Sequence, residues 1–274
     1  MKKTDSDEFY KIFESEGKHH FKKLYFINKK KFNKNWGSYL FDGQKYIYDK
    51  SMYEKQKLLF ELCKTNNHIL EIGSYMGHSV LIMLLANPKI QITAIDISEK
   101  YAKPSLEYLQ KQFPNSKINF IKNDSLKVLS NLKDKFDLFH VDGTHTHEVI
   151  SKEFLFLLNL RKNNKVKILF DDVWSMPYLR QNILKNFEII RNLIPNSNQP
   201  NFYVEIHVNE KMFKKNLKDF KFENLKIFYK YRLIKIFFKI LFLNMLMIKI
   251  YRFFFKRFKF AEKIKIKLLN FIYQ

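Results

Sequence analysis

The sequence predicts an α/β fold with a doubly wound, mostly parallel sheet that an antiparallel hairpin closes at its C-terminal end. Between residues 67 and 170, short apolar runs alternate regularly with segments of helical length. The apolar runs are nearly continuous, which is typical of parallel strands buried on both faces. Glycine and acidic residues follow several of these runs, at the carboxyl ends of the strands, where doubly wound sheets bind their ligands.

The expected elements alternate along the chain. The strands are 69–73, 91–96, 118–122, 136–141 and 166–170, and the helices between them are 78–86, 100–113, 125–132 and 146–160. A helix over 51–63 precedes the first strand, because Leu58, Leu59 and Leu62 recur at helical spacing. A helix over 175–193 and two strands over 202–208 and 225–230 complete the fold, and these two strands would form the hairpin.

Composition and charge divide the chain into a basic leader over 1–50, an α/β domain over 51–230 and a basic tail over 231–274. At 274 residues the chain is long enough for one such domain with appendages. Its net charge of +23 favours an anionic partner such as nucleic acid, a membrane or an acidic glycan. The single cysteine, Cys63, excludes an intrachain disulfide, and residues 1–16 are too polar for a secretory signal. Both observations predict a cytoplasmic protein.

A glycine loop follows the first expected strand and is the strongest functional signal. Its candidate cofactor-binding residues are Glu71, Gly73, Ser74, Gly77 and Ser79, in the motif Glu-x-Gly-x-x-x-Gly. Such a loop presents backbone N–H groups at a helix N-terminus, where a polar ligand can bind. The second strand ends at Asp96, whose carboxylate can accept hydrogen bonds from ribose hydroxyls. Two glycines in place of three argue against a dinucleotide, so we expect a nucleoside cofactor; a purely structural turn is the alternative.

The loop and the acid together resemble the first motif of class I S-adenosylmethionine-dependent methyltransferases, acid-x-Gly-x-x-x-Gly. In that family the loop borders the methionine part of the cofactor, and the acid that ends the second strand holds the ribose. The resemblance implies a Rossmann-like sheet that binds S-adenosylmethionine. It also implies that an acid after the third strand contacts the adenine amino group, a role that falls here on Asp124 and Ser125. Asp124 as the N-cap of the next helix is the alternative.

Three carboxylates, Asp142, Asp171 and Asp172, follow two strands that should be neighbours in the sheet. Clustered acids repel one another unless a cation or a proton compensates them. Oxygen ligands suit a hard ion such as Mg²⁺, which keeps positions open for water or substrate oxygens. His145 lies three residues after Asp142 and could accept a hydroxyl proton. The alternative is that His145 packs on its helix while the acids cap turns.

These residues resemble the metal-dependent O-methyltransferases that act on sugar hydroxyls, the macrocin O-methyltransferase type and its relatives. The resemblance covers residues 65–175 and rests on Asp-Gly-x-His after the fourth strand and an acidic pair after the fifth. It implies Mg²⁺ ligation by Asp142, Asp171 and Asp172, with Asp142 and His145 as catalytic residues. The usual Pro-Gly-Gly before the fifth strand is absent, since residues 161–165 read Arg-Lys-Asn-Asn-Lys. The Asn/Asp-Pro-Pro-aromatic signature of N-methyltransferases is absent too.

We therefore expect an S-adenosylmethionine-dependent O-methyltransferase, assisted by Mg²⁺, that acts on a hydroxyl of a sugar or glycoconjugate. A metal-independent methyltransferase is one alternative. The other is a protein that keeps the fold without catalysis and binds a membrane or RNA.

The tail over 231–274 is basic and amphipathic. It carries eleven Lys and Arg residues and one acid, Glu262, and most of the basic residues fall on one side of an ideal helix. A basic helix with Phe and Leu on its other side suits an anionic membrane surface, so we expect peripheral contact with the inner face of a membrane. Packing on the enzyme, or on a second subunit of a homo-oligomer, is the alternative. Nucleic acid is the least favoured partner, because the apolar face would be exposed in solution.

Overall fold

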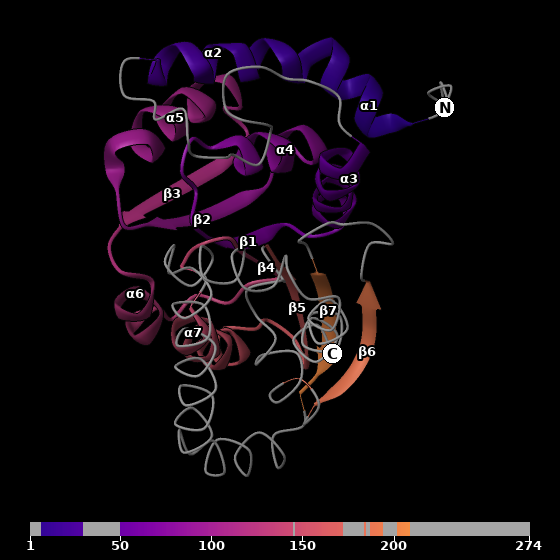
Figure 1. The fold of residues 1–274 in the computed structure, drawn as a ribbon, viewed down its shortest axis with the longest axis vertical. Coiled ribbons are helices and arrows are strands. Elements are labelled where there is room, and N and C mark those ends of the chain that lie inside the picture. Colours follow the sequence, from indigo (N-terminus) through magenta and orange to yellow (C-terminus); the bar gives the residue numbers. More distant parts are fainter. Residues whose placement is uncertain are drawn as a thin grey trace, which may run out of the picture. The chain divides into compact units, whose positions relative to one another are not determined.

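Seven strands form one mixed sheet in the computed structural model (Figure 1). In chain order they are β1 (His68–Ile72), β2 (Gln91–Asp96), β3 (Lys117–Lys122), β4 (Leu138–Val141), β5 (Lys165–Phe170), β6 (Glu188–Leu193) and β7 (Phe202–His207). Their order in the sheet is β3-β2-β1-β4-β5-β7-β6. The first five pair in parallel, whereas β7 pairs antiparallel with both β5 and β6. The predicted Rossmann-like, mostly parallel sheet with antiparallel C-terminal strands is confirmed.

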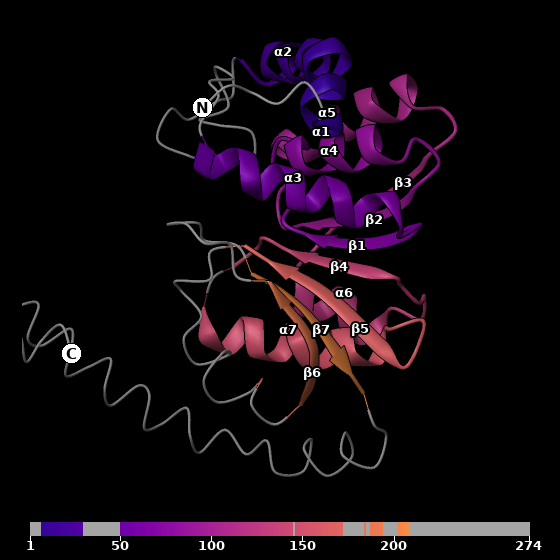
Figure 2. The same cartoon turned by 90° about the vertical axis from the view of Figure 1, so that its right-hand side faces the viewer.

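The structure describes residues 7–29, 50–144, 146–171, 184, 187–193 and 202–208. All of them lie within residues 1–216, which form one unit of the chain. Their helices are α1 (Glu8–Ile12), a π-helical turn η1 (Phe13–Gly17), α2 (Lys18–Asn28), α3 (Lys50–Lys64), α4 (His78–Ala86), α5 (Glu99–Gln112), α6 (Ser125–Asn131) and α7 (His147–Asn159). Figure 2 shows α1 to α5 on one side of the sheet and α6 and α7 on the other.

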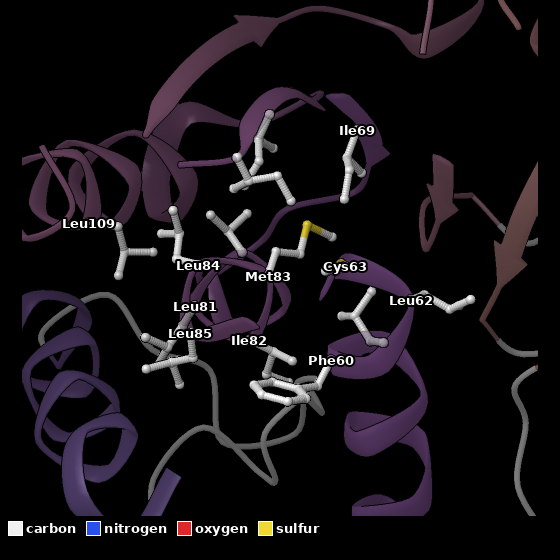
Figure 3. Packing of buried hydrophobic residues seen from close by; sticks show 14 of the residues in the cluster. Phe60, Leu62, Cys63, Ile69, Leu81, Ile82, Met83, Leu84, Leu85 and Leu109 are labelled. Carbon is white, nitrogen blue, oxygen red and sulfur yellow. The ribbon is translucent and has the colours of Figure 1, made fainter. Parts of the chain in front are cut away.

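Helix α4 is the most buried helix, and it begins at the glycine loop. Its sequence is apolar on all sides, because the helix lies between the sheet and the helices outside it. Side chains of α3 and α4 pack in one apolar cluster, in which Phe60 and Cys63 face Ile82 and Met83 (Figure 3). This packing fixes the start of α4, and therefore the glycine loop, against the end of β1.

Part of the predicted leader belongs to the same core. Phe9, Phe13, Phe21 and Leu24 of α1, η1 and α2 are at most 4% exposed and join the cluster of α3 and α4. Helix α2 is also tied to α5, because the Asn28 side-chain amide donates to the Ser105 hydroxyl at 2.8 Å. The domain boundaries at residues 50 and 230 stay predictions.

One predicted element is wrong. Residues 188–193 form the strand β6 and do not end a helix over 175–193. The antiparallel hairpin therefore consists of residues 188–193 and 202–207, in place of the expected 202–208 and 225–230. Ile189 and Ile190 are β-branched and suit a strand once β7 offers a pairing edge, so tertiary pairing outweighs the helical spacing. Residues 172–183, 225–230 and the tail 231–274 lie outside the described residues.

None of the helices within the described residues is both long and apolar enough to cross a bilayer.

Candidate functional site

Four strand ends meet at one edge of the sheet and carry most of the predicted site residues. The register pairs Ile72 of β1 with Ile95 of β2 and with Val141 of β4, and Val141 with Phe170 of β5. The next residues along these strands form a row across the edge, in the order Asp96, Gly73, Asp142, Asp171. The backbone N–H of each of the last three donates to the neighbouring strand at 2.8 Å. Neighbouring members of the row are therefore about one strand spacing, roughly 5 Å, apart.

The glycine loop has three residues with positive φ, namely Gly73 (88°), Tyr75 (41°) and Gly77 (75°). Glycine is required at position 73, because a Cβ there would lie 2.1 Å from the backbone oxygen of Asp142. Tyr75 adopts a conformation that costs a non-glycine residue free energy. Strain held in a loop at the end of a parallel strand is typical of a ligand-binding turn.

Asp96 holds this loop in place. Its Oδ2 accepts the backbone N–H groups of Ser74 at 3.1 Å and Tyr75 at 2.8 Å, and its Oδ1 accepts the N–H of Ser98 at 2.8 Å. A carboxylate offers about four acceptor positions. Three of them serve the backbone, so the fourth remains for an external donor such as a ribose hydroxyl.

Glu71 lies beneath the loop and is completely buried. It accepts hydrogen bonds from the hydroxyls of Ser74 (2.7 Å) and Ser79, and its Oε1 lies 3.1 Å from Nδ1 of the buried His140. These side chains are therefore engaged with one another and shape the loop from below. Direct contact of Glu71, Ser74 or Ser79 with a cofactor stays a prediction.

The N-terminus of α4 faces no side-chain cap, since its N-cap residue is Gly77. Unsatisfied N–H groups and the helix dipole make such an end favourable for an anionic group. The neighbouring His78 adds no positive charge of its own, because burial lowers its pKa to about 3 and keeps the imidazole neutral. The loop and the helix start together, which we call the cradle, therefore suit a polar ligand that carries an anionic group.

Asp124 and Ser125 follow the end of β3, the strand that pairs with β2 on the side away from β1. Asp124 is the N-cap of α6 and accepts the backbone N–H of Lys127 at 3.2 Å, as the alternative interpretation predicted. The Ser125 hydroxyl donates to Oε1 of Glu153 at 2.5 Å. The pKa of Glu153 is raised to about 7, mainly by burial and to a smaller extent by the nearby Asp124, against the lowering effect of the Ser125 hydrogen bond. Adenine contact by Asp124 and Ser125 stays a prediction.

Asp142 and Asp171 form the other part of the row, which we call the acidic edge. Asp142 is half-buried and Asp171 is 3% exposed. Asp171 makes an ion pair with Lys55, which reaches it from the middle of α3 and is itself 5% exposed. His145 and Asp172, predicted as general base and metal ligand, lie outside the described residues.

The described part of the acidic edge does not fit a magnesium site. No group of three His, Cys, Asp or Glu side chains that could hold a metal occurs among the described residues. Of the three predicted ligands, Asp142 and Asp171 lie on neighbouring strand ends, and Asp171 already faces the Lys55 ammonium.

Sequence reasoning missed three polar residues of this site: Lys55, His140 and Glu153. Two of them, Lys55 and Glu153, have a signal in the sequence. Lys55 lies four and seven residues before Leu59 and Leu62, on the buried face of its helix. Glu153 lies in the apolar stripe of α7 between Ile150 and Leu157. A charged residue on a buried helix face indicates a buried partner.

Comparison with known families agrees with this edge of the sheet. Residues 70–173 match the model of a protein family described as a methyltransferase domain. The matched segment extends from β1 to just beyond β5, so it contains the glycine loop, Asp96 and the acidic edge.

Two curated relatives match over the same part of the chain. One is a protein of Arabidopsis thaliana named as a caffeoyl-CoA O-methyltransferase, 37% identical over 105 residues, which are 37% of this chain and 45% of the relative. The other, tapetum-specific methyltransferase 1 of the same plant, is 35% identical over 106 residues, again 37% of this chain and 45% of the relative. The chain therefore spans less than half the length of the curated relatives it matches.

Solved structures share the fold at low sequence identity. An O-methyltransferase from Bacillus cereus, in complex with SAH, has a TM-score of 0.51 and 14% identity over 69% of this chain and 91% of its own. The O-methyltransferase TomG from Streptomyces achromogenes, in complex with SAM, has a TM-score of 0.50 and 14% identity over 69% and 90%. These likenesses establish the methyltransferase type of α/β fold.

Proposed function

We propose that this chain transfers the methyl group of S-adenosylmethionine to a hydroxyl group. The observation that carries the proposal is the strained glycine loop, held by Asp96, at the uncapped start of α4. The match of residues 70–173 to a methyltransferase domain and the O-methyltransferase names of the relatives support it.

The cradle suits this cofactor in two respects. A ribose hydroxyl would donate to the remaining acceptor position of Asp96. The carboxylate of the methionine part would lie at the N-terminus of α4, where the helix dipole favours an anion. Bound there, S-adenosylmethionine supplies an electrophilic methyl group on a sulfonium.

The acceptor would lie toward the acidic edge. Its hydroxyl oxygen forms the new bond to the methyl carbon as the sulfur–carbon bond breaks, and the hydroxyl proton passes to a base. His145 is our candidate for that base and Asp142 for a residue that orients the acceptor. No step of this mechanism uses magnesium, because the Lys55 ammonium already pairs with Asp171 and the third predicted ligand, Asp172, lies outside the described residues.

The acceptor class that we propose is a hydroxyl of a sugar or glycoconjugate, from the Asp-Gly-x-His motif and the acidic pair. A phenolic hydroxyl is the second candidate, favoured by the caffeoyl-CoA O-methyltransferase names of two curated relatives. We also propose that residues 231–274 contact an anionic membrane from the cytoplasmic side, which would bring the enzyme close to a membrane-linked acceptor.

Calorimetric titration with S-adenosylmethionine, followed by transfer of a labelled methyl group to glycan and caffeoyl acceptors, tests the proposal. We expect micromolar-range binding that Asp96→Ala weakens, and label in one acceptor class. A protein that shows no binding while folded is a non-catalytic relative, and the proposed function is then wrong. Flotation with anionic vesicles, with the chain and with a version that ends at Lys230, tests the tail; equal binding by both contradicts the membrane contact.

A further inference from the structure

Lys55 is buried and pairs with the carboxylate of Asp171 at the end of β5. Its side chain is 6% exposed and that of Asp171 is 5% exposed. We propose that the Lys55 ammonium is the resident cation of the acidic edge and takes the place of a divalent metal there. On the function proposed above, methyl transfer by this chain therefore needs no divalent metal.

The position of Lys55 is set by the fold. Asp142 and Asp171 continue the β4–β5 register, and the Asp171 N–H donates to the Val141 oxygen at 2.8 Å. The helix α3, which follows the leader and precedes β1, turns the face of Leu59 and Leu62 toward the core. Lys55 lies on that face, and its long side chain brings a positive charge to Asp171 at the end of β5.

The charge balance at Asp171 argues against a metal ion in addition to the Lys55 ammonium. A buried carboxylate needs a positive partner, and Asp171 already has one. A divalent ion bound to Asp171 would either repel the nearby ammonium or displace it from this pair, and both arrangements cost free energy. Within the parts of the chain that the structure describes, no third ligand helps to offset that cost.

Lys55 is thus a positioning residue that acts through Asp171. It holds the Asp171 carboxylate in one place beside Asp142 and neutralises one of the two charges. The buried ammonium faces Asp171 and not the acceptor, and no metal-bound oxygen is available at this edge, so removal of the acceptor's proton depends on a side-chain base.

Mn²⁺ binding tests the inference without any acceptor. Electron paramagnetic resonance titration of the full chain with Mn²⁺ should show no stoichiometric site, and Lys55→Arg should behave like the wild type. Lys55→Met removes the ammonium from Asp171, and we expect the affinity of the protein for Mn²⁺ to rise at least about tenfold. Methyl transfer by the wild type should be unchanged by EDTA. One tightly bound Mn²⁺ per wild-type chain, or loss of transfer on chelation, overturns the inference.

The same samples separate this inference from the proposed function. If Lys55→Met does not fold, the wild type and Lys55→Arg still decide the matter by their Mn²⁺ binding. If S-adenosylmethionine does not bind to any of the proteins, the proposed function fails, whereas the Mn²⁺ titration still reports whether Lys55 excludes a metal.

Discussion

The glycine loop with Asp96 and the acidic edge lie side by side, yet they are built from different kinds of contact. In the loop, Asp96 binds backbone groups 21 and 22 residues before it, and Glu71 binds hydroxyls three and eight residues after it. At the acidic edge, Asp171 depends on Lys55, which lies 116 residues earlier. A sequence motif can therefore describe the loop, whereas only the fold brings together the pair at the acidic edge.

The largest expected effect concerns the acidic edge. Lys55→Met leaves the Asp171 carboxylate buried without its cation, and we expect a loss of about 3–5 kcal/mol in the free energy of unfolding. The double variant Lys55→Met with Asp171→Leu should recover most of that loss, because it removes the buried charge as well. Urea denaturation of the four proteins of this cycle measures the coupling.

Lys57→Met is the matched control on the same helix. Lys57 also makes an ion pair, with Asp7 at 2.6 Å, but its side chain is 38% exposed. Its loss should cost less than about 1 kcal/mol. A similar cost for Lys55→Met and Lys57→Met would show that the acidic edge does not depend on a buried pair.

The next effect concerns the loop. Gly73→Ala adds a Cβ at 2.1 Å from the Asp142 oxygen on a residue with φ of 88°. Backbone strain and overpacking together should cost about 3–4 kcal/mol, and cofactor affinity should fall with the loop geometry. Thermal unfolding and calorimetric titration with S-adenosylmethionine measure both.

Gly77→Ala sharpens the comparison within the loop. Its φ is also positive, at 75°, but the nearest atoms to the new Cβ are side-chain carbons at 3.3–3.5 Å. Only the conformational cost of about 1–2 kcal/mol applies. If Gly73→Ala costs no more than Gly77→Ala, the close approach of β1 and β4 is not what requires glycine.

A third effect depends on pH and involves Glu153, behind Ser125. Burial raises its pKa in the folded state to about 7 from an ordinary value of 4.5. The folded protein thus binds more protons than the unfolded chain between these values, and stability falls as pH rises from 4.5 to 7, by about 3 kcal/mol. Glu153→Gln stays neutral and should be more stable than the wild type by that amount at pH 8, with no difference at pH 4.

Glu148→Gln provides the control, since Glu148 lies in the first turn of the same helix and is half-buried beside Lys152. Its effect should stay below about 0.5 kcal/mol at either pH. Chemical denaturation at pH 4, 6 and 8 tests the set. A Glu153→Gln variant whose advantage does not grow with pH means that Glu153 is ionised in the folded protein below neutrality.

The same contrast between local and distant contacts explains what could be predicted from the sequence. The strands β2 and β3 and the helix α4 follow from apolar runs and turn residues, because each is specified by its own segment. The prediction of a helix over residues 188–193 was wrong, because this segment forms the strand β6 by pairing with β7. The roles of Asp96 as loop clamp and Asp124 as N-cap lie within short stretches of sequence.

The roles of Lys55 and Glu153 could be recognised only once the fold was known. Both occupy buried faces of amphipathic helices, so the sequence signals a buried charge without naming its partner. Their partners, Asp171 and Ser125, lie on other elements of the sheet edge. The magnesium prediction depended on the acids alone; it stays a prediction, because Asp172 lies outside the described residues, and it did not include the Lys55 ammonium that pairs with Asp171.

The smallest expected effect tests whether the loop binds its ligand through Asp96. Asp96→Asn keeps the size of the side chain but replaces one acceptor oxygen by an NH₂ group. An NH₂ group is a donor, so it cannot accept the backbone N–H groups that the carboxylate oxygen accepts. Affinity for S-adenosylmethionine should fall about tenfold, or about 1.4 kcal/mol. Asp137→Asn is the control, because Asp137 accepts the His68 N–H at 3.0 Å at the start of β1, at the other end of that strand. It should leave the affinity unchanged. An equal loss in both variants would mean that Asp96 acts only through stability, and the ribose contact would then have to be sought elsewhere along the edge.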